Sequence, residues 1–198
     1  YEAGCQLRRL IDQVLEFTRL DRETIALRPE AFEPTAYAAT FVQGYEAEAE
    51  RQGLVLRHHV DSSLPAVLTA DLWHLDQTLS HLMDNALKFT IDGEIHFEMA
   101  PGPDDEEGRP TLALHVTDSG VGVPPHLQEH VFEVFNQADA STTRAFSGVG
   151  LGLSISRRLA ALMGGSLQLE SPWPEDRSEG GCRVSLVLPL VEGAVPVP

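Results

Sequence analysis

The chain has 198 residues and a formal net charge of -16, with 30 acidic residues against 14 basic ones. Such a surface repels a phosphate backbone, which excludes nucleic acid as a partner. Hydrophobic content of 42% is ordinary for a globular chain, and no apolar run approaches the roughly 20 residues that span a bilayer. We therefore expect a cytoplasmic chain with no membrane contact of its own. Because it begins with Tyr1 rather than Met, we expect a longer parent protein, whose membrane anchoring stays open.

The first predicted element is a helix over residues 5–21. Apolar residues recur there at spacings of three and four, which is typical of an amphipathic or coiled-coil helix. One such helix cannot bury its apolar stripe alone, so we expect a partner helix, supplied by a second copy of the chain in a homodimer. The following "TIALRPE" predicts a short strand that ends at Pro29.

Helices and strands then follow in mixed order. We expect helices over residues 34–51, 72–89 and 149–163, with Asp71 as the N-cap of the second, and a short helical patch over 125–135. We expect strands over residues 54–60, 66–70, 93–100, 111–117, 164–171 and 181–190, and a flexible tail over 191–198. This order predicts an α+β fold with one mixed sheet and helices layered on one face.

The first motif with chemical content is "DSGVG", in which Asp118 ends a predicted strand and Gly120 and Gly122 follow. An ionised carboxylate only accepts hydrogen bonds, so in a pocket it can take the exocyclic amino group of adenine and repel the carbonyl oxygen of guanine. Glycines let a flat base lie against the backbone. The alternative interpretation is a plain turn between a strand and a helix.

The second motif is "HLMDNALKFT", in the predicted helix over residues 72–89. His81, Asn85 and Lys88 stand at positions i, i+4 and i+7, so they share one face. The amide oxygen of Asn85 suits Mg²⁺, and the Lys88 ammonium suits a phosphate. The alternative is an ordinary solvated face, and a single histidine such as His81 is more often structural than a ligand.

The third motif is a run of alternate glycines, Gly148, Gly150 and Gly152, which leads into a predicted helix. The free N–H groups and the positive dipole end of a helix N-terminus favour phosphate. The P-loop pattern is absent, and Leu153 breaks the dinucleotide pattern G-x-G-x-x-G.

The segment between the glycine clusters, residues 123–147, is built as a mobile lid or else is an ordinary long loop. Phe132 and Phe135 can latch it to the core. Arg144 is its one full positive charge and can reach a terminal phosphate.

These motifs, in this order, resemble the ATP-binding catalytic domain of sensor histidine kinases, in the group that includes gyrase-type, mismatch-repair and heat-shock chaperone ATPases. "HLMDNALKFT" resembles the asparagine box, "DSGVG" and "GVGLGLSIS" the two glycine boxes, and "VFEVFNQAD" the phenylalanine box. The family fold is a two-layer α/β sandwich, with a mixed sheet of about five strands covered by about three helices. The resemblance implies three regions: residues 1–28 as the second helix of a dimerisation hairpin with its link, 29–190 as the ATP-binding domain, and 191–198 as the tail.

The resemblance also implies roles for single residues. Asp118 selects adenine, Gly120 and Gly122 shape the base pocket, and Asn85, with or without His81, holds Mg²⁺. The remaining residues expected to contact ATP or its phosphates are Lys88, Phe89, Arg144, Gly148, Val149, Gly150, Leu151 and Gly152. Asn85, Lys88 and Arg144 are the expected catalytic residues, and ATP and Mg²⁺ are the expected cofactors.

Three departures from the family pattern bear on activity. None of the eight histidines stands in the pattern of the family's phosphoacceptor, so we expect this chain not to phosphorylate itself. We expect it to phosphorylate the first hairpin helix of its parent protein. A response-regulator receiver domain is the expected further partner. Ser147 replaces a usual glycine, and Cys182 a usual Thr or Ser. His81 stands where hydrolysing relatives have a Glu, which favours a kinase over an ATPase with a conformational output. The intact motifs favour a kinase over a second alternative, a non-catalytic adaptor.

Overall fold

Five strands form the central sheet of the computed structural model, which describes residues 26–133, 151–174 and 180–193. The strands are β2 (Val55–Val60), β4 (Glu94–Gly102), β5 (Thr111–Asp118), β6 (Ser166–Glu170) and β7 (Cys182–Pro189), in the spatial order β2-β4-β5-β7-β6. β2 runs parallel to β4, and the other neighbours are antiparallel. The predicted mixed sheet is confirmed.

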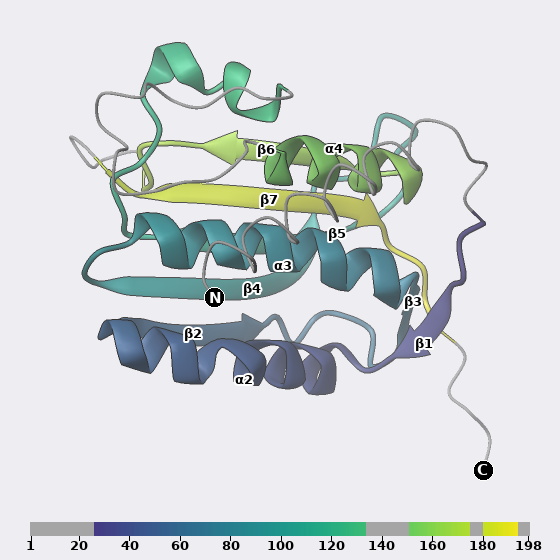
Figure 1. Cartoon of the computed structure of the whole chain (residues 1–198). Helices are drawn as coiled ribbons and strands as arrows, with labels where there is room; N and C mark the ends of the chain where they lie inside the picture. The colour runs from purple at the N-terminus through teal and green to yellow at the C-terminus, as the bar shows by residue number, and fades with distance from the viewer. Residues whose placement is uncertain (1–25, 134–150, 175–179, 194–198) are drawn as a thin grey trace.

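Three helices lie side by side on one face of this sheet (Figure 1). They are α2 (Pro34–Gln52), α3 (Leu72–Phe89) and α4 (Gly152–Leu162). α2 covers β2 and β4, α3 contacts β5, and α4 contacts β6 and β7. The structure thus has the two-layer arrangement that the sequence predicts, and the other sheet face carries no helix among the described residues.

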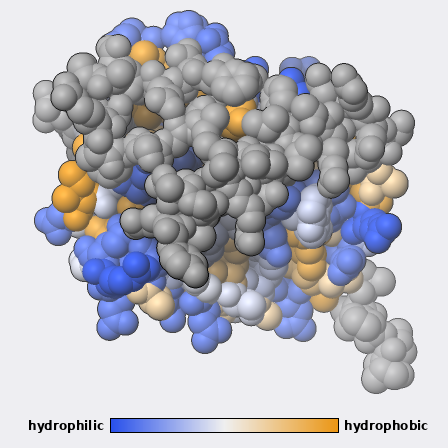
Figure 2. All heavy atoms as spheres, in the orientation of Figure 1, coloured by the Kyte–Doolittle hydropathy of each residue, from blue (hydrophilic) through white to orange (hydrophobic). Residues whose placement is uncertain are grey.

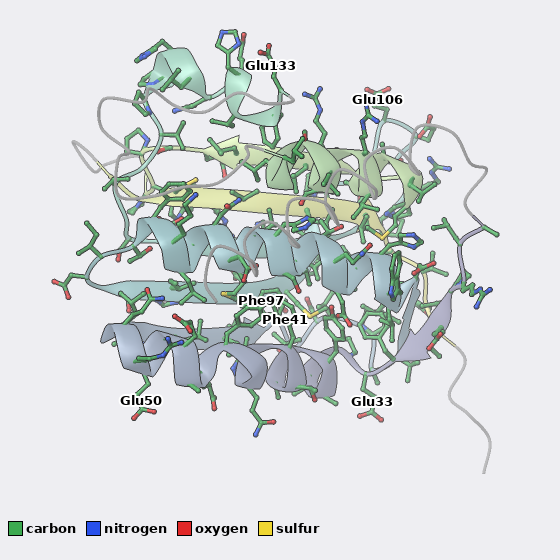
Figure 3. The ribbon with its side chains drawn as sticks, viewed as in Figure 1. Glu33, Phe41, Glu50, Phe97, Glu106 and Glu133 are labelled. Atoms are coloured by element: carbon green, nitrogen blue, oxygen red, sulfur yellow. The ribbon has the colours of Figure 1, made fainter. Side chains whose placement is uncertain are left out.

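The core lies between the helices and the sheet. Along β4, Ile95, Phe97 and Met99 are fully buried, whereas His96 and Glu98 alternate with them and face the other side. The ring of Phe41 from α2 meets that of Phe97 with centroids 5.3 Å apart (Figure 3). Apolar residues recur about every 3.6 positions in the helices and at every second position in the strands, and both sets face this one buried layer.

The remaining two strands, β1 (Glu30–Phe32) and β3 (Leu68–Ala70), form a small antiparallel sheet at one end of the molecule. The predicted strand ended by Pro29 is wrong for residues 26–29, which form no strand, while residues 24 and 25 lie outside the described residues. The observed strand begins after Pro29, because its register is set by pairing with β3 and by the burial of Phe32. Residues 191–193, expected in the flexible tail, are hydrogen-bonded here, with Thr69 N donating to Val191 O and Gly193 N donating to Val67 O.

Two further elements differ from expectation. The helical patch predicted over residues 125–135 forms two single 3₁₀ turns within the described residues, η1 (Pro125–Leu127) and η2 (His130–Phe132). α4 begins at Gly152, with Leu151 as its N-cap, whereas the sequence predicts a start at residue 149.

In the view of Figure 2, hydrophilic residues interspersed with single apolar ones cover the lower part of the molecule, over α2. None of the helices in the described ranges is long and apolar enough to cross a membrane.

Asp71 is the N-cap of α3, as predicted. Its Oδ1 accepts a hydrogen bond from His74 N at 3.0 Å, and its Oδ2 accepts one from Arg28 N at 2.7 Å. The His74 Nδ1 atom lies 2.9 Å from Asp71 Oδ1, close but not aligned as a hydrogen bond. Burial of Asp71 is outweighed by these hydrogen bonds, which hold the pKa of its carboxyl below the usual range. One carboxylate therefore ties the incoming chain to the first turn of α3.

We predict that Asp71→Ala lowers the free energy of unfolding by about 2–3 kcal/mol at pH 7, because a helix cap and a hydrogen bond from Arg28 are lost together. The difference should shrink as pH falls below about 4, since the stabilisation needs an ionised carboxylate. Chemical denaturation measures both effects. Asp61→Ala, which removes a carboxylate bonded to Ser63 in a turn, is the control and should cost less. Equal losses for both variants would contradict the capping role.

Candidate functional site

The polar face of α3 carries His81, Asn85 and Lys88, all half-buried. The opposite face is anchored in the core by the buried residues Leu79, Leu82, Met83 and Ala86. The Lys88 ammonium lies 4.8 Å from the centroid of the Phe89 ring, and burial lowers the pKa of Lys88. The structure thus holds the three side chains that the sequence places on one face in a stiff helix.

Asp118 is the last residue of β5, opposite Ile95 on β4 and Cys182 on β7. Burial raises the pKa of its carboxyl to about 6, against the hydrogen bond that its Oδ1 accepts from Gly120 N at 2.9 Å. Burial also raises the pKa of Cys182, and the nearby Asp118 carboxylate adds to that rise. An acid with such a pKa is poorly solvated and is suited to accept a hydrogen bond from a ligand.

The loop after Asp118 packs closely against the end of α3. A Cβ on Gly120 would lie 2.4 Å from the backbone oxygen of Phe89, so only glycine fits there. Gly120 O accepts a hydrogen bond from Gly181 N at 2.8 Å, which ties the loop to the start of β7. Gly122 has a φ of +70°, and a Cβ there would press on Ser171 Oγ. The first glycine cluster is therefore wedged between α3 and the turn before β7.

The first turn of α4 lies beside α3 at His81. A Cβ on Gly152 would lie 3.9 Å from the Cβ of His81. The Nδ1 atom of His81 is 3.2 Å from Ser156 Oγ, and burial lowers the pKa of His81. The second glycine cluster thus ends beside His81, with the N–H groups of a helix N-terminus at that place.

α3 therefore connects the two glycine clusters. The first lies against Phe89 and the second ends against His81, eight residues or about 12 Å apart along the helix axis. Asn85 and Lys88 stand between these ends. The arrangement offers a carboxylate, a close backbone and the Lys88 ammonium at one end, the Asn85 amide in the middle, and helix N–H groups at the other end.

Some predicted residues take no part in this description. Arg144, Gly148, Val149 and Gly150 lie outside the described residues, as do Phe135 and Ser147. The side chain of Leu151 is buried in the core, so only its backbone is placed to face a ligand. Phe132 packs partly against the core, with the Arg157 guanidinium 5.7 Å from its ring centroid.

Sequence reasoning missed three contributors. Thr90, the C-cap of α3, is buried, and its Oγ1 has no hydrogen-bond partner among the described residues. Ser156 is fully buried beside His81, and Gly181 binds Gly120. The sequence signal available for Gly181 was the pair of consecutive glycines, Gly180 and Gly181, because glycine permits the positive φ that both adopt. A buried serine in a helix carries no comparable signal.

A surface groove of about 630 Å³ lies elsewhere, between the 3₁₀ turns, α4 and β6. None of the predicted site residues that the structure describes lines it; its apolar wall includes Phe132, Leu167 and Leu169. The candidate site is thus defined by the α3 contacts rather than by this groove.

Comparison with known families decides the relationship. Residues 70–192, from the end of β3 to the segment after β7, match the family described as "Histidine kinase-, DNA gyrase B-, and HSP90-like ATPase". The chain belongs to this family. The match includes α3, the Asp118 loop and α4, and it confirms the resemblance drawn from the four motifs.

Two curated relatives are a signal transduction protein and a sensor histidine kinase by name. The hybrid signal transduction protein dokA of Dictyostelium discoideum is 35% identical over 165 residues, which cover 82% of this chain and 10% of dokA. The sensor histidine kinase RcsC of Escherichia coli K12 is 30% identical over 165 residues, which cover 83% of this chain and 17% of RcsC. The chain thus spans less than a fifth of the length of either relative.

Solved structures agree on the fold. Full-length ShkA, crystallised in complex with AMPPNP, matches with a TM-score of 0.83 at 28% identity, over 99% of this chain and 38% of ShkA. The catalytic domain of the histidine kinase ThkA matches with a TM-score of 0.65 at 21% identity, over 82% of this chain and 96% of that one, which shows the shared fold.

We predict that Gly120→Ala distorts the site, because the added methyl would collide with the backbone oxygen of Phe89. The expected loss is about 2–3 kcal/mol of unfolding free energy. Gly44→Ala is the matched control: Gly44 occupies an exposed position of α2 with nothing near its Cβ position, so alanine there should stabilise by about 0.5–1 kcal/mol. Denaturation curves test both, and a neutral Gly120→Ala would contradict the close approach.

We predict that Asp118→Asn stabilises the ligand-free protein by about 1–2 kcal/mol at pH 8. The folded pKa of about 6 exceeds the unfolded value, so folding favours the protonated acid: the favourable contribution is complete below about pH 4 and is lost as pH rises through 6. The advantage of the neutral amide should vanish below about pH 4. Unfolding curves at pH 4, 6 and 8 measure the difference in stability between the variant and the wild type. A variant less stable than the wild type at pH 8 would show that burial does not destabilise the ionised carboxylate.

Proposed function

We propose that this domain binds Mg-ATP along the polar face of α3 and presents the γ-phosphoryl group to a histidine of its parent protein or dimer partner. The observation that supports this most is that Gly120 packs against Phe89 and Gly152 faces His81, at two points along α3. We assign the Phe89 end of α3 to the base and the His81 end to the phosphates. The relatives dokA and RcsC and the AMPPNP complex of ShkA support the same assignment.

Base selection is assigned to Asp118. At neutral pH its half-buried carboxylate accepts one hydrogen bond from Gly120 N and has further lone pairs to offer. An exocyclic amino group satisfies one of them, whereas a carbonyl oxygen in its place is repelled. Gly120 and Gly122 keep the backbone free of side chains beside the base.

Phosphate binding is assigned to the other end. The N–H groups of the first turn of α4, starting at Gly152, favour an anion, and Lys88 adds a positive charge. We assign Arg144, Gly148, Val149 and Gly150 to the same phosphates from the sequence motifs alone.

The fit to Mg²⁺ depends on Asn85. No group of three or more His, Cys, Asp or Glu in the described part of the chain is arranged to hold a metal ion. Asn85 offers one hard oxygen ligand on the α3 face, which fits an ion that brings its other ligands as phosphate oxygens and water. Bound Mg²⁺ would neutralise phosphate charge, and Asn85 would orient it.

The transfer itself needs little chemistry from the chain. The bond between the γ-phosphorus and its bridging oxygen breaks, a bond to an imidazole nitrogen forms, and ADP leaves. Lys88, the α4 amides and Arg144 stabilise the charge on the phosphoryl oxygens, while Asp118 holds the base so that the phosphates point correctly. The acceptor histidine, its hairpin helix, homodimerisation through residues 1–28 and a response-regulator partner belong to this same proposal.

The test is equilibrium binding of ATP with Mg²⁺ by calorimetry. We expect saturable binding by the wild-type chain at pH 8, and about 10- to 100-fold weaker binding by Asp118→Asn, since a hydrogen bond to a charged group is lost. Affinity of the wild type should fall as pH drops below about 6, where Asp118 takes up a proton. Asp61→Asn removes the same charge elsewhere and should bind as the wild type does.

A labelling arm separates the alternatives. With γ-labelled ATP, the chain itself should stay unlabelled, and a supplied hairpin carrying a histidine should become labelled. Release of inorganic phosphate without a hairpin would favour an ATPase with conformational output, and absence of any ATP binding would favour an adaptor. Either result would overturn the kinase assignment.

A further inference from the structure

One side-chain contact joins the two helices that carry the proposed nucleotide site. His81 on α3 and Ser156 on α4 are 75 residues apart in the sequence, and Nδ1 lies 3.2 Å from Oγ. Ser156 has no exposed surface. A buried hydroxyl that reaches across a helix interface has its partner fixed by packing, so the contact defines how the two helices sit against each other.

The same histidine ring supports the start of α4. Gly152 and Ser156 are four residues apart, so they share one face of α4, and this face is turned toward His81. A Cβ on Gly152 would lie 3.9 Å from the Cβ and 4.0 Å from the Cγ of His81. α4 is therefore bonded to His81 at Ser156, and its first turn, with its free N–H groups, begins at Gly152 close to the same ring.

Other buried hydroxyls on these helices behave differently. Thr78 Oγ1 donates to His74 O, and Ser154 Oγ donates to Leu151 O, so each satisfies the backbone of its own helix. The Ser156 hydroxyl instead contacts a side chain of the neighbouring helix. Ser156 therefore links two helices, whereas Thr78 and Ser154 satisfy backbone groups of their own helices.

We propose that His81 is a positioning residue. Through Nδ1 and Ser156 it fixes the first turn of α4 against α3, and so sets the position of the α4 amides relative to Asn85 and Lys88. This inference rests on the proposed function and sharpens it, because the sequence leaves His81 open as a Mg²⁺ ligand. The ring acts through α4 rather than by touching the nucleotide.

Ser156→Ala tests this directly, because Ser156 is buried and a direct role at the nucleotide is excluded. We expect the affinity for Mg-ATP to fall about 3- to 10-fold, the range that one hydrogen bond supplies. Thr78→Val is the matched control: it removes a buried hydroxyl bonded within its own helix and should leave the affinity within about twofold. Unchanged affinity in Ser156→Ala would overturn the inference.

A pair of substitutions at His81 distinguishes positioning from ligation. The amide of asparagine places a polar atom where Nδ1 stands, and that of glutamine places one where Nε2 stands. We expect His81→Asn to bind Mg-ATP within about twofold of the wild type, and His81→Gln to lose about 3- to 10-fold. The opposite order would assign the ring to ligation through Nε2 and overturn the positioning role.

The double variant His81→Ala/Ser156→Ala should bind no more weakly than His81→Ala, since both changes break one contact. Additive losses of affinity would show that His81 and Ser156 act independently and would contradict a shared contact. The wild type separates the two proposals: if it binds Mg-ATP and Ser156→Ala equals it, the positioning inference alone fails. If the wild type does not bind Mg-ATP, the proposed function fails and this inference falls with it.

Discussion

The arrangement depends on one carboxylate in an unfavourable place. Asp118 ends β5 beside buried Cys182, and one backbone N–H from Gly120 does not offset its loss of solvation, so its pKa rises to about 6. In the proposed function, the base of the nucleotide satisfies this carboxylate. The glycines around Asp118 have a packing reason of their own, because a Cβ on Gly120 would collide with the backbone oxygen of Phe89 and Gly122 has a positive φ. In the proposed function they also leave the backbone open to a base.

α3 turns this local feature into a site. Its apolar residues fix it in the core, its last turn touches the Asp118 loop at Phe89, and its middle touches α4 at His81. Because a helix is stiff, the two glycine clusters have a set separation, with Asn85 and Lys88 between them. Contacts with β5 and the capping carboxylate of Asp71 help to hold this helix in place.

Local patterns predicted most of this from sequence. The amphipathic stripe and the cap at Asp71 predicted α3 with its observed bounds, and the four motifs predicted a family that the match over residues 70–192 confirms. Non-local contacts were beyond that reasoning. The position of β1 depends on pairing with β3, and the His81–Ser156 contact depends on how two helices pack, so neither is written in its own segment. Residues 134–150, where several phosphate ligands are proposed, lie outside the described structure.

The most direct test is competition between ATP and GTP for the wild-type domain at pH 8 with Mg²⁺ present. Both nucleotides carry the same phosphates, so the α4 amides, Lys88 and the metal ion contribute alike, and only the base meets Asp118. The account predicts that ATP binds at least about tenfold more tightly than GTP, since the carboxylate accepts from an amino group and repels a carbonyl. Equal affinity for the two would contradict a base site at Asp118.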